Sequence, residues 1–319
     1  MANQEGDQGE VKVGMSEGFS WSWQIEWQTP YEFHGHAIKR VITDEVSQYQ
    51  RSMVVEFYRF GKALIIDGKI QSTVQDEFIY HEALVHPLLL SLNNPKRILI
   101  LGAGEGATAR EVLKYKSVEE VVVVDIDKTV IDFAKRHLQE WHQGSFDDPK
   151  VKVVIQDAYD YVVNSGEKFD AVIMDLTDPI AGGPSQRLYT LEFFQAVKRI
   201  INDDGGLVTQ STSPSFSLET FAVIHNTLRS AFRNVSYGVV YVPAFDGLWG
   251  FNYASDAIDP AKLSQAEVED RIRSRLNGRL RFYDGATHVN MFNVPKYLRE
   301  TIQAVKGIST LANPVSTPA

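Results

Sequence analysis

Two aspartates stand three residues apart in the stretch DLTDPIAGGP (175–184), directly after the apolar run FDAVIM (169–174). A carboxylate at the end of a buried strand can take a proton from a reacting group or hold a cation. The alternative is structural, because an aspartate before a proline often shapes a turn and one at a strand end is often solvated. Two glycines and a proline follow Asp178 and give a loop that can bend, which favours a mobile lid over a carboxylate-lined pocket. We therefore predict a functional site at Asp175 and Asp178.

A glycine-rich loop follows another strand-like run, in LGAGEGATARE (101–111). Gly102, Gly104 and Gly106 permit a tight turn and a close approach of a ligand to the backbone. The spacing also nearly fits the dinucleotide-binding pattern, with an alanine in the last position. Glu105 inside the loop would repel a pyrophosphate but suits a positively charged group. The loop therefore favours an adenosine-containing ligand that carries a cation.

Two further acidic residues end strand-like runs. Asp125 ends VVVVD, where a carboxylate can accept hydrogen bonds from both hydroxyls of a ribose; the alternative is a cap at the strand end. Asp157, followed by Ala158, can bind an adenine amino group through its carboxylate together with a backbone amide. Ligands of open α/β sheets bind at the carboxyl ends of the strands, which is where all these groups stand.

The elements that must position these residues follow from the hydrophobic pattern. Five apolar runs of strand length alternate with stretches of helical spacing, which indicates a parallel sheet covered on both faces. Two later runs are separated only by AFDGL, too short for a crossover, so they must pair antiparallel. These runs cover residues 97–102, 121–126, 151–157, 169–175 and 205–211, then 235–243 and 249–255. We predict an α/β fold with a Rossmann-like, methyltransferase-type sheet of seven strands, parallel with an antiparallel terminal hairpin.

A small antiparallel β domain is expected before this sheet. Trp21, Trp23, Ile25 and Trp27 alternate as on a strand with one aromatic face, and residues 47–73 contain strand-like runs joined by glycine turns. The following stretch, 76–92, predicts a helix interrupted or kinked near its proline, Pro87. We predict a flexible N-terminus (1–18), a β domain (19–73), a Rossmann-like catalytic domain (74–306) and a flexible tail (307–319).

The composition excludes several classes of protein. A formal net charge of −9 and a pI near 5.4 argue against a nucleic-acid partner, which requires a basic face. The absence of cysteine excludes disulfides and thiolate metal sites. No apolar run is long enough to span a membrane and no signal pattern begins the chain, so we expect a cytoplasmic protein without a membrane partner. His86, His137 and His142 have no metal-ligand spacing and are interpreted as structural or surface residues, so we expect no metal.

The combined motifs resemble the polyamine aminopropyltransferases of the spermidine synthase family over residues 20–300. The GEGATAREVL, DPIAGGP and WG variants resemble thermospermine synthases and the triamine- or agmatine-using enzymes of thermophiles. The matching stretches are YQ (49–50), LIIDGKIQSTVQDEFIYHE (64–82), LGAGEGATAREVL (101–113), VDID (124–127), QDA (156–158), DLTDP (175–179) and LYT (188–190).

This resemblance implies transfer of the aminopropyl group of decarboxylated S-adenosylmethionine to an amine, with release of 5′-methylthioadenosine. The donor is a co-substrate, and no separate cofactor is expected. Asp175 is expected to deprotonate the amine with help from Tyr80, while Asp178 anchors another acceptor nitrogen. The expected donor-binding residues are Gln50, Gln71, His81, Gly102, Gly104, Glu105, Asp125, Asp157 and Ala158. The expected acceptor-binding residues are Asp178, Tyr80, Gln71, Phe245, Asp246 and Trp249.

Several alternatives remain at this point. Tyr80 and His81 lie on an apolar helix, where such residues are often packing groups with a satisfied polar tip. Phe245 stands where many family members have a tyrosine, so it is reduced to a wall and Asp246 is expected to bind some of the cationic charge. Gln75 replaces the basic residue that usually precedes DE, which leaves the reach of the acceptor open.

The other function classes are a methyltransferase on the same fold and a non-catalytic polyamine-binding protein. The acceptor can be putrescine, agmatine, an aminopropyl-diamine or spermidine. The aromatic N-terminal strand, together with the usual state of the family, predicts a homodimer or homotetramer.

Overall fold

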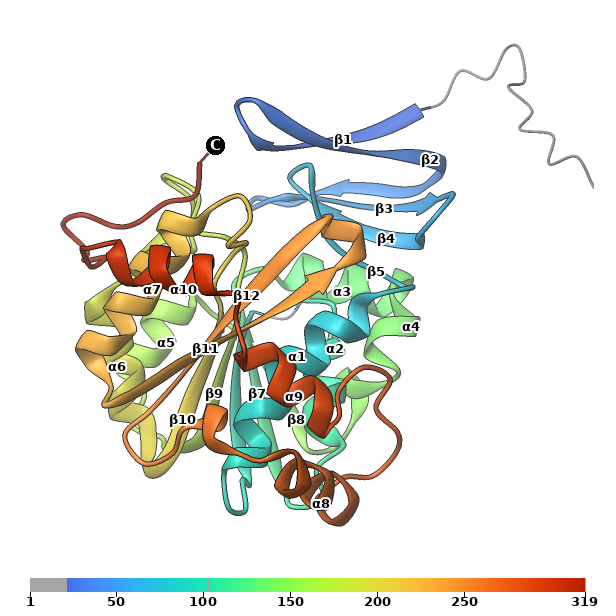
Figure 1. Ribbon diagram of the computed structural model, residues 1–319. Helices are drawn as coiled ribbons and strands as arrows, with labels where there is room; N and C mark the ends of the chain where they lie inside the picture. The colour runs from blue at the N-terminus through green and yellow to red at the C-terminus, as the bar shows by residue number, and fades with distance from the viewer. Residues whose placement is uncertain (1–21, 103, 319) are drawn as a thin grey trace, which may run out of the picture.

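The computed structural model describes residues 22–102 and 104–318, which form two β-sheets with helices packed mainly around the larger one (Figure 1). The predicted flexible N-terminus and Trp21 lie outside the described residues. The predicted β domain and the predicted seven-stranded sheet are both present, and the predicted fold class is confirmed.

The N-terminal sheet is a five-stranded antiparallel meander in which every strand pairs with the next. Its strands are β1 (Ser22–Thr29), β2 (Glu32–Val46), β3 (Arg51–Phe57), β4 (Gly61–Ile66) and β5 (Lys69–Thr73). Trp23, Ile25 and Trp27 are exposed on one face of β1, as their alternation predicted. The intervening polar residues, Glu26 among them, point to the opposite face, toward the rest of the molecule.

The larger sheet has the strand order β11-β12-β10-β9-β6-β7-β8. Strand β12 is antiparallel to both of its neighbours, and the other pairs from β10 to β8 are parallel. The strands are β6 (Arg97–Gly102), β7 (Glu120–Asp125), β8 (Val151–Ile155), β9 (Phe169–Asp175), β10 (Ile201–Gln210), β11 (Asn234–Val242) and β12 (Gly247–Ser255). Alternate residues of β6 enter two different cores, Ile98 and Ile100 on one face and Leu99 and Leu101 on the other. Helices therefore cover both faces, as apolar runs without alternation predict.

The helices are α1 (Glu77–Ser91), α2 (Ala107–Leu113), α3 (Lys128–His137), α4 (Gln139–His142), α5 (Ala158–Asn164), α6 (Leu191–Ile200), α7 (Leu218–Ala231), α8 (Gln265–Arg275), α9 (Gly285–Phe292) and α10 (Lys296–Ala304). Short 3₁₀ turns are η1 (Ser145–Asp147), η2 (Gln186–Tyr189), η3 (Pro243–Phe245) and η4 (Pro260–Lys262). Within residues 22–102 and 104–318, no helix is long and apolar enough to cross a membrane.

Helix α1 continues through Pro87, so the predicted interruption is wrong, while the alternative of a kink stays a prediction. A proline inside a helix leaves the carbonyl four residues earlier without its N–H donor. Here that carbonyl belongs to Ala83, and it accepts a hydrogen bond of 2.7 Å from the Tyr253 hydroxyl on β12. The tertiary contact replaces the lost helical bond, which allows the helix to extend to Ser91.

The C-terminal segment also differs from expectation. Residues 307–318 were predicted to be a flexible tail because they are polar, yet Ser309 is fully buried. The Ser309 carbonyl accepts a hydrogen bond from the Leu191 amide, and its hydroxyl accepts one from the Val315 amide, both of 2.9 Å. The segment is held in place by these hydrogen bonds and by Val315, which packs against the core between the larger sheet and α6, and the composition does not reveal these contacts.

Candidate active site

A cavity of about 610 Å³ lies between the two sheets, at the carboxyl ends of β6, β7 and β9. The N-terminal sheet contributes one wall and the glycine-rich loop, α1 and the 176–185 loop contribute others. Of the predicted site residues, all but Asp246 line this cavity: Gln50, Gln71, Tyr80, His81, Gly102, Gly104, Glu105, Asp125, Asp157, Ala158, Asp175, Asp178, Phe245 and Trp249. The structure thus brings together residues that are up to 199 positions apart in the chain, Gln50 and Trp249 being the extremes.

Asp175 is fixed where β9 ends beside β6. Gly102 pairs with Asp175, and a Cβ at Gly102 would lie 2.2 Å from the Asp175 carbonyl oxygen, so only glycine fits there. The carboxylate accepts hydrogen bonds from the Tyr80 hydroxyl (2.7 Å) and the Thr108 hydroxyl (2.5 Å), one on each oxygen. Each oxygen keeps a further lone pair, so the group can still accept a proton from a ligand in the cavity.

Tyr80 both packs against other aromatic rings and donates a hydrogen bond to Asp175. Its ring packs edge-on against Phe251 and near Phe245, and the residue is almost fully buried. Burial, followed by the charge of Asp175, raises the pKa of Tyr80 well above its ordinary value. The hydroxyl therefore stays protonated at neutral pH and acts as a hydrogen-bond donor that orients Asp175.

Asp178 lies at the cavity wall one turn beyond Asp175. Its carboxylate accepts hydrogen bonds from the Gln210 amide (3.1 Å) and the Thr212 hydroxyl (3.3 Å). Gln210 is the last residue of β10, and Thr212 lies two residues after it. Burial raises the pKa of Asp178 to about 6, although these two hydrogen bonds act in the opposite direction. Thr212 has a φ of 64°, a left-handed conformation that strains a β-branched residue. Such local strain is typical of functional sites.

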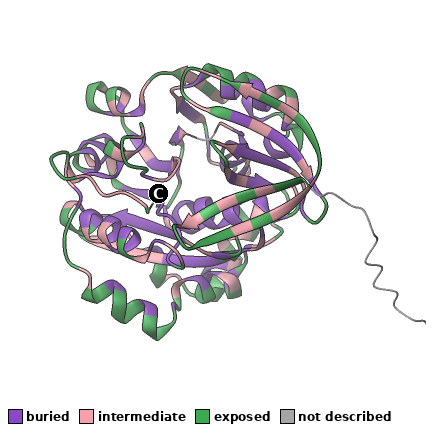
Figure 2. Cartoon of the chain, turned by 90° about the horizontal axis from the view of Figure 1, so that it is seen from above, coloured by how far each residue is buried: buried purple, intermediate pink, exposed green. Residues whose placement is uncertain are grey.

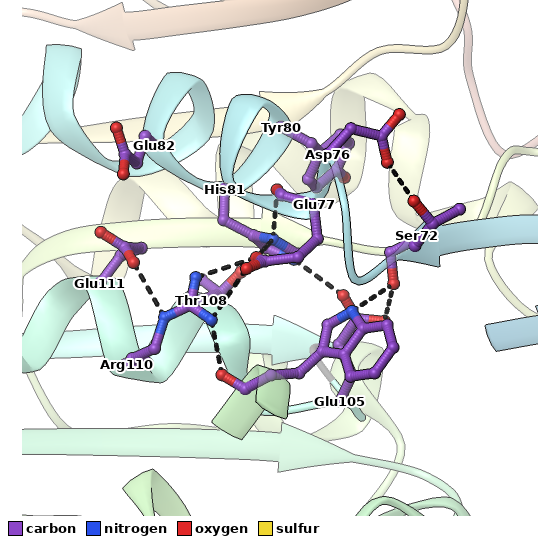
Figure 3. Close-up of polar contacts among 12 residues, drawn as sticks. Ser72, Asp76, Glu77, Tyr80, His81, Glu82, Glu105, Thr108, Arg110 and Glu111 are labelled. Atoms are coloured by element: carbon purple, nitrogen blue, oxygen red, sulfur yellow. Dashed lines mark hydrogen bonds and ion pairs between the residues drawn. The ribbon is translucent and has the colours of Figure 1, made fainter. Parts of the chain in front are cut away.

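A buried ionic network holds Glu105 (Figure 3). The two ring nitrogens of His81 contact Glu105 at 2.9 Å and Glu77 at 2.8 Å, and Arg110 pairs with Glu77 at 2.9 Å. Burial alone would lower the pKa of His81, but hydrogen bonds and charges from Glu105 and Glu77 raise it to about 10. His81 is therefore a cation at neutral pH, and both ring nitrogens donate.

The other oxygen of Glu105 accepts a hydrogen bond of 2.9 Å from Ser72, whose hydroxyl in turn accepts one of 2.8 Å from the Trp141 indole. Glu105 is thus oriented from β5 on one side and from α1 on the other. The charges of Arg110, Glu77, His81 and Glu105 balance in pairs, and Glu105 is the carboxylate of this group that lines the cavity, where a cationic ligand can contact it. This arrangement fits the role predicted for Glu105 in holding the positively charged end of the donor.

We expect Glu105→Gln to raise the KM of the donor by about 10- to 100-fold, since a hydrogen bond to a charged group contributes about 1.5–3 kcal/mol. Steady-state kinetics with varied donor and saturating acceptor measure this change. Glu140→Gln is the matched control, because Glu140 forms only a partly exposed ion pair with Lys62. Equal donor KM values in the two variants would contradict a donor contact at Glu105.

The remaining donor residues surround the ends of β7 and β8. Asp125 ends β7, and burial raises its pKa to about 6. A Cβ at Gly104 would lie 3.6 Å from the Asp125 carboxylate and would clash with Val130 at 2.4 Å. Glycine at this position therefore leaves space beside the Asp125 carboxylate. Asp157 caps helix α5 through the amides of Tyr159 and Asp160 and pairs with Arg187 at 2.6 Å. Its carboxylate is therefore already engaged, and the adenine contact predicted for Asp157 and Ala158 stays a prediction.

Asp246 is the one predicted site residue that lies elsewhere. It follows η3 with a φ of 49°, and its side chain is 65% exposed and accepts a hydrogen bond from the Tyr241 hydroxyl. It lines a second hollow of about 340 Å³ together with His34 and Arg59. The prediction that Asp246 binds the acceptor is corrected, because the left-handed turn directs its carboxylate away from the main cavity, while Phe245 and Trp249 remain as walls.

Sequence reasoning missed several cavity residues. Glu26 on β1 lines the cavity and accepts a hydrogen bond of 2.8 Å from the Ile70 amide. Burial raises the pKa of Glu26 above its ordinary value. The alternation of WSWQIEW contained the signal, since Glu26 must lie opposite the exposed tryptophans. Gln210, at the carboxyl end of β10, could have been found from the same strand-end rule that selected Asp175.

The three histidines predicted to be structural or surface residues each contact a polar group outside the cavity, His137 through Glu45 at 3.7 Å. His86 is buried between Glu111 (3.0 Å) and the Tyr115 hydroxyl (3.0 Å), and His142 accepts a hydrogen bond from the Gly144 amide. Among residues 22–102 and 104–318, no three histidine, aspartate or glutamate side chains are grouped so as to hold a metal ion.

Two known family models match this chain. Residues 77–263 match the spermine/spermidine synthase domain, and residues 22–73 match the spermidine synthase tetramerisation domain. The chain belongs to the spermine/spermidine synthase family. The resemblance predicted from the motifs is confirmed.

Relatives and solved structures agree with this family. The polyamine aminopropyltransferases of Sulfurisphaera tokodaii and Sulfolobus acidocaldarius are 63% and 62% identical, each over 94% of this chain and 100% of the relative. A crystal structure of spermidine synthase in complex with the transition-state analogue AdoDATO superimposes with a TM-score of 0.83 at 31% identity, covering 89% of this chain and 95% of that one. Spermidine synthase from Thermotoga maritima gives a TM-score of 0.80 at 29% identity, with the same coverage.

Proposed function

We propose that the protein transfers the aminopropyl group of decarboxylated S-adenosylmethionine to a polyamine acceptor and releases 5′-methylthioadenosine. The enzyme class follows from membership of the spermine/spermidine synthase family and from relatives named polyamine aminopropyltransferase. The observation that carries the assignment of residues is the Asp175 carboxylate, held by Tyr80 and Thr108 at the wall of a cavity that Glu105 also lines. The methyltransferase alternative is not favoured.

The proposed reaction balances as a displacement at carbon. Asp175 takes a proton from the acceptor ammonium, which frees the lone pair on nitrogen. This nitrogen attacks the methylene carbon bonded to the sulfonium, a C–N bond forms as the C–S bond breaks, and neutral methylthioadenosine leaves. Asp175 then releases its proton to solvent. The protein supplies position and a deprotonated nucleophile, which is most of what such a displacement needs.

The acceptor is proposed to lie along the carboxylates on the side of Asp178. Asp175, Asp178 and Glu26 all line the cavity, and they offer separate partners to an amine with two or more cationic nitrogens. Trp249 and Phe245 pack together with ring centroids 4.8 Å apart and provide an apolar surface for methylene groups. Putrescine, agmatine, an aminopropyl-diamine and spermidine all carry this chemistry, and the motif variants favour a thermospermine-forming or related activity.

A direct assay tests this proposal. The purified protein is incubated with decarboxylated S-adenosylmethionine and, separately, putrescine, agmatine, norspermidine or spermidine, and products are identified by mass spectrometry. We expect equal amounts of methylthioadenosine and of an amine heavier by one aminopropyl group. Formation of a methylated amine from S-adenosylmethionine, without methylthioadenosine, would instead support the methyltransferase alternative.

The exposed face of β1 and β2 is proposed to mediate self-association into a dimer or tetramer. Trp23, Ile25, Trp27 and Phe33 are each about half exposed there, and the sheet matches a domain named for tetramerisation. Both strands consist of exposed and intermediate residues, drawn green and pink in Figure 2. We expect sedimentation velocity to give a mass of two or four chains for the wild type and a smaller mass for Trp23→Ser/Trp27→Ser. An unchanged mass in the double variant would place the interface elsewhere. The cytoplasmic location expected from the sequence stays a prediction.

A further inference from the structure

The C-terminal segment reaches the active-site cavity. After α10 the chain contacts the first residue of α6 through the Ser309 carbonyl and the start of α7 through the Ser316 carbonyl. Its end lies on the side of the larger sheet that faces the N-terminal sheet (Figure 1). Thr317 and Pro318 line the cavity together with the 180–185 loop. Residues 315–318 are named here the terminal strap.

Three hydrogen bonds attach the terminal strap. The Thr317 amide donates to the Pro179 carbonyl at 2.9 Å, directly after Asp178 in the chain. The Thr220 hydroxyl of α7 donates to the Ser316 carbonyl at 2.8 Å, and the Gln186 amide donates to the Val315 carbonyl at 3.3 Å. The strap is therefore bonded to the loop that carries Asp178 and also to the body of the domain.

The loop beneath the strap has its own supports. The Ile180 amide and the Ser185 hydroxyl both donate to the Asp178 carbonyl at 2.8 Å, and the Gly183 amide donates to the Ile180 carbonyl at 2.9 Å. These bonds shape the loop but none of them ties it to α7. The strap supplies a connection to α7, in addition to the hydrogen bonds from Gln210 and Thr212 that hold Asp178 to the end of β10.

The residues of the strap can bound the cavity but carry no charge that would bind a cationic amine. Residues 307–318, GISTLANPVSTP, carry no charged side chain, whereas the cavity beside them is lined by Asp175, Asp178 and Glu26. The side chains of the strap offer a cationic nitrogen no ion pair in exchange for its hydration, and that loss is costly. An amine whose last nitrogen stops at the carboxylates avoids this cost.

We propose that the terminal strap is a specificity-determining element that limits the length of the acceptor amine. This inference rests on the proposed function, in which Asp178 anchors the acceptor. In that arrangement the strap is the part of the cavity wall that is bonded next to Asp178, where the far end of a longer amine would extend. Removal of the strap should admit longer amines without a change in donor binding.

The test compares the wild type with a variant that lacks residues 316–319, on α,ω-diamines of three to eight carbons and on spermidine. We expect the ratio of kcat/KM for the longest to the shortest productive amine to rise about 10-fold, the scale for one or two methylenes in an apolar pocket. The donor KM and the affinity for methylthioadenosine should stay within about 2-fold of the wild type, since neither ligand needs the acceptor end.

Two single substitutions keep the test decisive. Thr317→Pro removes the amide donor to Pro179 but keeps the chain length, and it should shift the ratio in the same direction to a smaller extent. Leu311→Ala, at an exposed position of the same segment, should leave the ratio unchanged. An unchanged ratio in both the truncation and Thr317→Pro, or an equal loss for every amine, would overturn the proposal. Failure of the wild type to aminopropylate any amine would instead overturn the proposed function.

Discussion

Asp175→Asn is expected to lower turnover by about 10²- to 10⁴-fold, the range for loss of a positioned general base. The acceptor is an ammonium ion in neutral water and has no lone pair for attack until a proton leaves. Asparagine keeps the size, and its single oxygen can still accept a hydrogen bond from one of the two hydroxyls, while the other hydroxyl must turn to accept from the NH2 group. The amide does not take up the proton. The loss should therefore appear in kcat rather than in binding.

Single-turnover rates at saturating donor and acceptor measure this loss, and calorimetric titration with methylthioadenosine measures the donor pocket. We expect the methylthioadenosine affinity to stay within about 3-fold of the wild type, because Asp175 is not needed to bind the neutral product. Asp204→Asn, an exposed aspartate on the neighbouring strand β10, is the control and should retain full activity. A near wild-type rate for Asp175→Asn would remove this residue from the mechanism and return it to the role of a strand end.

The strand pattern was sufficient to predict the larger sheet and the grouping of most candidate site residues around one cavity. In a parallel sheet the carboxyl ends of the strands meet at one edge, so Asp125 and Asp175 could be placed together without any knowledge of side-chain packing. The short spacing between the last two strands likewise predicted their antiparallel pairing, which β11 and β12 confirm. These inferences depend on backbone geometry, which local periodicity determines well.

Features that depend on a partner distant in sequence could not be predicted. Pro87 was expected to interrupt its helix, because the compensating hydroxyl belongs to Tyr253, 166 positions later. The bonds of residues 307–318 to the body of the domain are equally invisible in a polar sequence. Asp246 failed for a related reason: its direction depends on a left-handed turn, and the sequence FDG permits that turn without requiring it.

The residues expected to bind the donor line the cavity, but the sequence did not predict the ion pairs between them. Glu105 and His81 were both selected, yet the Arg110–Glu77–His81–Glu105 chain appears only when α1 and α2 pack together. Buried charges of this kind are tolerated because each has a partner, and removing one leaves the next uncompensated. The cavity thus has a rigid ionic wall near the glycine-rich loop and a hydrogen-bonded loop near Asp178.

Asp178→Asn is expected to lower kcat/KM for the acceptor by about 100-fold while making the folded protein more stable at pH 8. An ion pair or charge-assisted hydrogen bond to a partly buried carboxylate is worth about 3 kcal/mol, which gives the loss of affinity. The gain in stability has the same origin as the raised pKa. Without a ligand, burial makes the ionised form of Asp178 unfavourable, which destabilises the folded protein. A bound cationic amine offsets this unfavourable free energy.

The sign of the pH dependence follows from the pKa of Asp178, which rises from 3.8 to about 6 on folding. Above pH 6 the carboxylate is ionised in both states and the folded state bears the cost of burial, whereas below pH 4 it is protonated in both and the cost disappears. A rise of about two pKa units corresponds to about 3 kcal/mol, of which we expect about 1–2 kcal/mol because the group borders the open cavity. The melting temperature of Asp178→Asn should therefore exceed that of the wild type at pH 8, and the two should converge at pH 4.

The same titration predicts that wild-type kcat/KM for the acceptor falls as the pH drops below 6, because the protonated carboxyl no longer binds a cation. Deprotonation of the amine also raises kcat/KM as the pH increases, so the Asp178→Asn variant is needed to separate the two effects. The pH profile of kcat/KM for this variant should lack the step near pH 6 and keep the slope that comes from the amine. Asp203→Asn, an exposed aspartate on β10, should alter neither the profile nor the melting temperature. If Asp178→Asn were less stable than the wild type at pH 8 and bound the acceptor equally well, Asp178 would be a structural residue of its turn, and the acceptor would have to be anchored by Glu26 alone.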